Sequence, residues 1–134
     1  MILSCPHTIG HPSDHISFKS RGGLWPPHCV RHTEGAELHP KLNRKGIHLK
    51  VLKAQDRDED AYSGFQRTAL GDELKKRGIH NVAICGLATD YCVKQTALDA
   101  LKHQFETVVL TDLVRGVNVH SGDDQRALEE IEKA

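Results

Sequence analysis

The second half of the chain alternates between short apolar runs and longer amphipathic segments. Residues 80–87 (HNVAICGL) and 106–113 (ETVVLTDL) are continuous apolar runs of strand length, which is typical of strands buried on both faces of a sheet. Residues 70–78 (LGDELKKRG) have the pattern of a short helix that ends at a glycine, and residues 123–134 have the pattern of another helix. The alternation predicts strands and helices in turn.

Residues 88–103 (ATDYCVKQTALDALKH) are predicted to form a helix between the two apolar runs. Their apolar positions fall on one helix face, as expected for a helix packed on a sheet: Val93, Ala97, Ala100 and Leu101. Strands alternating with helices predict an α/β fold, a parallel sheet flanked by helices in three α/β/α layers. A length of 134 residues fits a single domain, residues 1–134. The chain ends within its last predicted helix, so we expect this domain to be incomplete.

The first half of the chain is less regular. Residues 5–46 are rich in Gly, Pro, Ser and Asp, which set turns and interrupt regular elements, so a long irregular segment is predicted there. Residues 46–53 (GIHLKVLK) alternate between apolar and polar side chains, which predicts a strand. Because long loops in compact domains often carry function, the irregular segment is a candidate for part of a binding site.

Charge and composition narrow the class of partner. Eighteen Lys and Arg balance eighteen Asp and Glu, so no strong field attracts nucleic acid or anionic lipid, and a small or neutral ligand is expected. No apolar run reaches the ~18 residues of a membrane span, and the first residues lack the pattern of a signal peptide. We therefore expect a cytoplasmic protein with no membrane partner, and an oligomer remains open.

Cysteine and histidine usage suggests reactive chemistry. The four cysteines form no CxxC pair, so free thiols are expected rather than disulfides or a zinc ribbon. Cys85 lies inside an apolar run and is expected to be an inert core residue. Ten histidines are many for this length, and five of them precede residue 33, which raises the hypothesis of a metal site.

Cys92 is the candidate nucleophile. It follows the strand predicted over residues 80–87, at the start of the next helix, and ligands of open parallel sheets bind at this edge. The helix N-terminus stabilises a thiolate, and free backbone amides there can hold an oxyanion. The alternative is that Cys92 is a small core residue. Lys53, at the end of the strand predicted over residues 46–53, would reach the same edge as a partner of the thiolate, although strand-end lysines are mostly solvated.

Several motifs in a fixed order carry a resemblance to a known family. They are HPSDHISF (11–18), GGLWPPHCV (22–30), EDAYSGF (59–65), CGLATDYCVKQTALDALKH (85–103) and VVLTDLVRGV (108–117). With these motifs the sequence resembles the nicotinamidases of the isochorismatase-like cysteine hydrolase superfamily, and the resemblance covers nearly the whole chain from residue 11 onward.

The resemblance implies hydrolysis of nicotinamide to nicotinate and ammonia in NAD salvage. Cys92 would attack the amide carbon and form a thioester, and Lys53 would stabilise the thiolate. The backbone N–H groups of Ala88 and Cys92 would form the oxyanion hole, next to a cis peptide bond between Leu87 and Ala88. A close analogue such as pyrazinamide offers the same flat ring, ring nitrogen and carboxamide, so the exact amide stays open.

The resemblance also implies a metal site and aromatic walls. His11 and His28 would bind a divalent metal, such as zinc, with manganese or iron as alternatives; a metal with an open position can hold the ring nitrogen of the substrate. Trp25 and Tyr91 would enclose the substrate ring. His15, although it lies in a motif, is expected to be a structural or surface residue.

The sequence departs from the family pattern at two places. No strand ahead of His11 carries the DxQ-type motif whose aspartate is the family's general acid and base, and residues 1–4 resemble the family's second strand. Ile9 stands where the family has its metal-binding aspartate, and His7 is a possible substitute ligand. Two other functions therefore remain: an amide hydrolase of the superfamily with another substrate, and an inactive fragment or paralogue that binds a small ligand, a metal or a partner.

Overall fold

The computed structural model describes residues 4–134, which form two compact units, Met1–Ala61 and Tyr62–Ala134. The predicted resemblance of residues 1–4 to a strand lies mostly outside the described residues, and Ser4 makes a parallel bridge to Ile47. The prediction of one domain over residues 1–134 stays a prediction.

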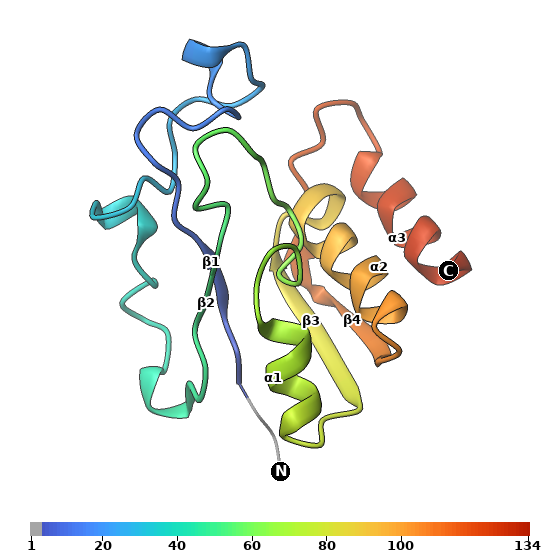
Figure 1. Ribbon diagram of the computed structural model, residues 1–134. Helices are drawn as coiled ribbons and strands as arrows, with labels where there is room; N and C mark the ends of the chain where they lie inside the picture. Colours follow the sequence, from blue (N-terminus) through green and yellow to red (C-terminus); the bar gives the residue numbers. More distant parts are fainter. Residues whose placement is uncertain (1–3) are drawn as a thin grey trace. The chain divides into compact units, whose positions relative to one another are not determined.

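The second unit contains the predicted alternation of strands and helices (Figure 1). Helix α1 (Leu70–Lys76) precedes strand β3 (Asn81–Leu87), and α2 (Lys94–Lys102) precedes strand β4 (Glu106–Arg115). Helix α3 (Asp123–Lys133) follows. β3 and β4 pair in parallel, with an irregularity in the register between Ile84 and Gly86. The α/β class with parallel strands is therefore confirmed.

Helix α2 packs on the β3–β4 pair through small side chains. Ala97 and Ala100 are completely buried, and Val93, just ahead of the helix, is 2% exposed. This is the helix face that the sequence predicts. Single methyl groups let the backbone of a helix approach a sheet closely, so these positions set the distance between α2 and the strands.

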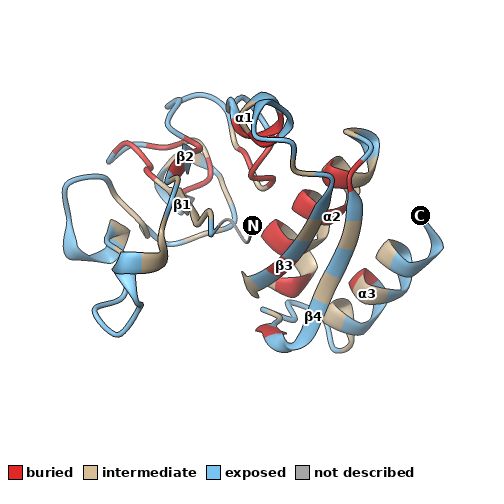
Figure 2. Cartoon of the chain, turned by 90° about the horizontal axis from the view of Figure 1, so that it is seen from below, coloured by how far each residue is buried: buried red, intermediate tan, exposed pale blue. Residues whose placement is uncertain are grey.

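The prediction that both strands are buried on two faces is wrong. On β3 the side chain of Ile84 is buried, whereas its neighbour Cys85 is exposed and Leu87 is 73% exposed. On β4, Val108 is 59% exposed. Successive side chains of a strand point to opposite faces, and within the second unit α2 packs on one of these faces. Figure 2 shows the buried residues of α2 and the largely exposed β3 and β4. Cys85 is therefore not a core residue.

The first unit consists mainly of loops around a short parallel ladder. Strand β1 (His7–Ile9) pairs with β2 (Val51–Lys53), so that Ile9 lies opposite Lys53. β1 lies inside the segment that was predicted to be irregular, and the strand predicted over residues 46–53 shortens to β2. Pro6 precedes β1; it has no N–H group to donate, and its carbonyl accepts a hydrogen bond from the Val51 N–H at 3.1 Å. The remaining short helical turns are η1 (Lys19–Arg21), η2 (Glu34–Ala36) and η3 (Arg44–Gly46).

Within the described residues, none of the helices is both long enough and apolar enough to cross a bilayer. All four cysteines are free thiols, as predicted.

Thr96 links helix α2 to the loop that precedes α1. The Gly64 N–H donates a hydrogen bond of 3.0 Å to Thr96 Oγ1, and Thr96 is 3% exposed. Because Thr96→Val would leave a buried N–H without an acceptor, we expect a loss of about 1–3 kcal/mol in the free energy of unfolding, measured by urea denaturation. Thr111→Val, at an exposed position of β4, is the matched control and should change this free energy by less than about 0.5 kcal/mol. Equal effects of the two substitutions would contradict the role of this hydrogen bond.

Candidate functional site

Cys92 lies in a π-helical turn, η4 (Thr89–Val93), between β3 and α2. The sequence predicted a helix from residue 88, but α2 begins only at Lys94. The peptide bond between Leu87 and Ala88 is cis, as the resemblance implied. The N–H groups of Tyr91 and Val93 both donate to the Ala88 carbonyl, at 3.1 and 3.0 Å. Cys92 is 8% exposed at the carboxyl end of β3, and π-helical turns often occur at functional sites. The oxyanion role of the Ala88 and Cys92 N–H groups stays a prediction.

Asp90 fixes this turn to the loop that follows β4. One carboxylate oxygen accepts a hydrogen bond from the Val117 N–H at 2.9 Å, and the other accepts from the Asn118 N–H at 2.8 Å. A carboxylate that accepts two backbone N–H bonds has little freedom to move. Asp90 therefore positions the turn that contains Cys92, and no local pattern of the sequence predicts this role because its partners lie 27 and 28 residues away.

Tyr91 has an aromatic neighbour that the sequence did not predict. Its ring centroid lies 5.3 Å from that of Tyr62, in the same unit. Desolvation, followed by the negative charges of Asp90 and Asp123, raises the pKa of Tyr91, so the phenol stays neutral at pH 7. Trp25, the other predicted wall, belongs to the first unit, and its pairing with Tyr91 stays a prediction.

His11 and His28 lie together in the first unit, with ring centroids 4.7 Å apart. His11 Nδ1 is 3.0 Å from the His28 carbonyl oxygen, and His28 Nδ1 is 2.8 Å from the Pro26 carbonyl oxygen. A carbonyl can only accept, so Nδ1 carries the proton in each ring and Nε2 keeps its lone pair. Backbone carbonyls commonly orient metal-binding histidines in this way. The donor set thus suits a divalent metal.

Burial keeps His11 neutral. The side chain is 2% exposed, and desolvation, followed by the nearby His15 and His28, lowers the pKa of His11 to about 4, although its bond to the His28 carbonyl and the charge of Asp60 act in the opposite direction. An imidazole must be deprotonated to bind a metal, so His11 is in its binding form at neutral pH.

The loop that carries Trp25 depends on a glycine. The Trp25 N–H donates to the Ser17 carbonyl at 3.0 Å, and the Gly23 N–H donates to the Phe18 carbonyl at 3.0 Å. A Cβ on Gly23 would lie 2.1 Å from the Ser17 carbonyl oxygen, so only glycine permits this approach of the two backbone segments. Gly23 of the motif GGLWPPHCV therefore has a steric cause, whereas Gly22 adopts a φ of 84°, which favours glycine.

Three residues of the first unit could share a metal. His11, His15 and Asp60 each place a potential ligand atom within 4.8 Å of the others. His15 is completely buried, which contradicts a surface position and fits a structural one. Its ring lies 4.0 Å from that of His11. Asp60 was not predicted, because it is 49 positions from His11 and no local pattern joins them.

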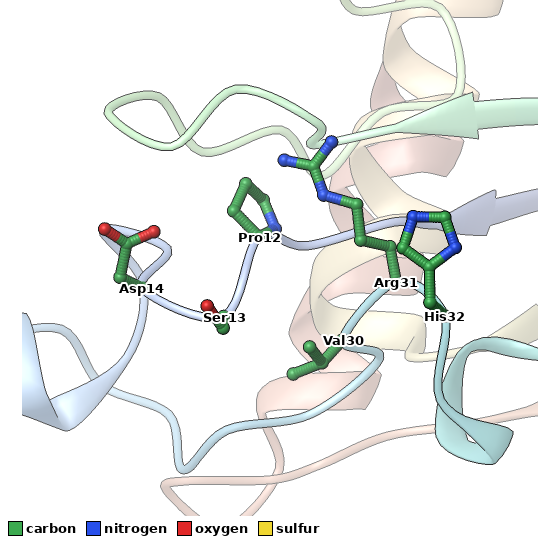
Figure 3. A pocket seen from close by; sticks show the side chains of 6 residues that line it. All are labelled: Pro12, Ser13, Asp14, Val30, Arg31 and His32. Carbon is green, nitrogen blue, oxygen red and sulfur yellow. The ribbon is translucent and has the colours of Figure 1, made fainter.

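A hollow of the first unit is lined in part by the residues that follow His11 in the chain, and it does not contain His11 or His15 themselves (Figure 3). Its volume is about 490 Å³, and it forms where the segment after His11 meets the segment after Cys29. Its lining contains none of the predicted site residues and consists of Pro12, Ser13, Asp14, Val30, Arg31 and His32.

Lys53 ends β2 and is 3% exposed, so it is not the solvated lysine that is usual at a strand end. It belongs to the first unit and Cys92 to the second, and their pairing stays a prediction.

His7 lies on β1, and its buried Nδ1 has no hydrogen-bond partner in the described part of the chain. His7 is not a member of the group that His11 forms with His15 and Asp60. Its role as a substitute ligand remains untested.

His7 should make stability depend on pH. Desolvation, followed by the charge of Lys53, lowers the pKa of His7 from 6.5 to about 4. In the unfolded chain the His7 imidazole is protonated near pH 6.5, but in the folded chain only near pH 4. The stability that is present above pH 6.5 is therefore lost as the pH falls from 6.5 to 4. The loss is on the order of 3 kcal/mol. Urea denaturation at several pH values should show a shallower dependence for His7→Gln than for the wild type. His80→Gln, at an exposed position, should leave the pH dependence of the free energy of unfolding unchanged. An equal pH dependence in the wild type and in His7→Gln would contradict the role of His7.

Comparisons with known proteins agree with this geometry. The family model described as the isochorismatase domain matches residues 2–134. A nicotinamidase of Escherichia coli is 39% identical over 92% of this chain and 68% of that protein. The crystal structure of a pyrazinamidase of Pyrococcus horikoshii in complex with zinc superposes with a TM-score of 0.89 and 46% identity, over 98% of this chain and 71% of that one.

The structure of PnC1 from L. infantum in complex with nicotinate superposes with a TM-score of 0.92 at 34% identity, and covers 98% of this chain and 68% of that one. The present chain thus spans about two thirds of the length of the curated relatives it matches.

Proposed function

The chain belongs to the isochorismatase domain family, and from this premise we propose that it is a nicotinamidase-type amide hydrolase that acts on nicotinamide or a close analogue such as pyrazinamide. The observation that carries the proposal is the place of Cys92, which is 8% exposed in the turn between β3 and α2. Relatives named nicotinamidase and pyrazinamidase, at about 40% identity, support the substrate class.

In the proposed reaction the Cys92 thiolate attacks the amide carbon of the substrate. The carbonyl oxygen becomes an oxyanion, which the N–H groups of Ala88 and Cys92 would stabilise by hydrogen bonds. Collapse of this intermediate breaks the C–N bond, leaves a thioester on Cys92 and releases ammonia after protonation of the nitrogen. Water then attacks the thioester carbon, which frees the carboxylic acid and restores the thiol. Lys53 would stabilise the thiolate.

The residues around the substrate would orient its ring. Trp25 and Tyr91 offer flat aromatic surfaces, and the neutral phenol of Tyr91 presents no charge to a neutral ring. His11 and His28 would hold a divalent metal, with zinc as the first choice because a pyrazinamidase relative was crystallised with it. When bound, this metal would supply an open coordination position for the ring nitrogen of the substrate.

Proton transfer to the leaving nitrogen is the step to which none of the predicted site residues is assigned. A positioned acid or base typically contributes about 10²–10⁴-fold to the rate of such a step.

The test is ammonia release from nicotinamide by the purified chain with added zinc, manganese or iron. Cys92→Ala should abolish release, because it removes the sulfur that forms the thioester. Cys85→Ala is the matched control, since Cys85 is an exposed thiol on the neighbouring strand and should be dispensable. Mass spectrometry of a quenched reaction should detect the acyl group on the wild type and on Cys85→Ala only.

Release that survives Cys92→Ala would contradict the thioester mechanism. If the folded wild type releases no ammonia from nicotinamide or from pyrazinamide, the enzyme proposal fails, and a domain that only binds a small ligand, a metal or a partner remains.

A further inference from the structure

Strand β1 brings no carboxylate to the imidazoles of the first unit. The residue two positions before His11 is Ile9, which lies in register with Lys53 on β2. A carboxylate comes instead from the loop after β2, where Asp60 places an oxygen within 4.8 Å of ligand atoms of His11 and His15. Among residues 4–134, His11, His15 and Asp60 form the group of three potential metal ligands whose ligand atoms lie this close to one another.

The loop that carries Asp60 is held against the histidine loop by a set of direct contacts. The Ile16 N–H and the Arg21 guanidinium both donate to the Arg57 carbonyl, at 2.9 and 3.0 Å. Arg21 also pairs with the Asp58 carboxylate at 2.8 Å. Because these contacts fix the backbone immediately before Asp60, its carboxylate faces His11 from a defined position and not from a freely moving loop.

His15 makes the contact next to Asp60. Its Nε2 is 2.9 Å from the Glu59 carbonyl oxygen and must carry the proton, because a carbonyl only accepts. Its Nδ1 then accepts from Ser17, whose Oγ is 2.7 Å away and whose N–H is 3.2 Å away. Both ring nitrogens of His15 are thus used within the protein. His15 is suited to position the Glu59–Asp60 backbone, whereas His11 keeps its Nε2 lone pair for a ligand.

We propose that Asp60 is the carboxylate ligand of a divalent-metal site in which His11 is an imidazole ligand, and that His15 is a positioning residue for Asp60. This inference rests on the metal-binding part of the proposed function. Zinc–nitrogen and zinc–oxygen bonds of about 2.0–2.2 Å put tetrahedral ligand atoms roughly 3.4 Å apart. Atoms that start within 4.8 Å reach this spacing by moving about 1 Å or less each.

Zinc affinity provides the first test, measured by competition with a chelating dye on the full chain without substrate. Asp60→Asn keeps the size of the side chain and removes its charge, and we expect zinc affinity to fall by about 100-fold or more, because even loss of an outer-shell partner costs 10–100-fold. Asp72→Asn is the matched control, since it removes the same charge from an exposed side chain of α1. It should change the affinity by less than about 3-fold.

Substitution by cysteine provides a second test that does not depend on the asparagine variant. A cysteine in the coordination sphere of Co²⁺ produces a thiolate-to-metal charge-transfer absorption. Asp60→Cys should add this absorption to the spectrum of the cobalt-loaded protein, whereas Asp72→Cys should match the wild type.

The outcomes separate this inference from the proposed function. If the wild type binds zinc and neither Asp60 variant differs from its Asp72 control, the assignment of Asp60 is overturned, while metal binding through His11 and His28 stands. If the wild type binds no zinc or cobalt, both are overturned. Ammonia release plays no part in these measurements, so an inactive but metal-binding protein would still support the assignment.

Discussion

The packing of α2 on the parallel β3–β4 pair is the interaction on which the second unit depends. Ala97 and Ala100 are completely buried against the strands, and because each contributes only a methyl group, the helix lies close to the sheet. This contact fixes the point at which the chain leaves β3 and turns into α2. Cys92 occupies that turn, and the Asp90 carboxylate holds the turn to the loop after β4. A larger side chain on the α2 face would displace the proposed nucleophile together with the helix.

The first unit is held together differently, by polar side chains that are buried and hydrogen-bonded. His11, His15 and Ser17 are almost completely buried, and each bonds to other groups of the same unit. Burying a polar group without a partner costs free energy, so each of these bonds must form when the loops adopt this arrangement. A unit of loops around a three-residue ladder thereby acquires a defined structure.

The hydrogen bonds that order these loops also prepare their chemistry. Backbone carbonyls take the Nδ1 protons of His11 and His28, which leaves the Nε2 lone pairs available, and burial keeps His11 neutral at physiological pH. His15 binds the carbonyl next to Asp60 by the same kind of bond. Folding and preparation of the proposed metal site are thus one process, because removal of a structural hydrogen bond would also change a tautomer or displace a carboxylate.

The sequence by itself determined the α/β class, the buried face of α2 and the place of Cys92 after a parallel strand. These features depend on residues that are close together in the sequence, such as the periodicity of a helix or strand and the residues of a motif. Only the tertiary structure decided that β3 and β4 are covered on one face, which leaves Cys85 exposed, because an apolar run reads the same whether one face or two are covered. The same holds for β1 and for Asp60. A strand of three residues, such as β1, forms only by pairing with its partner strand. The hydrogen bond between His15 and Glu59 joins residues that are 44 positions apart, so no local sequence pattern predicts it.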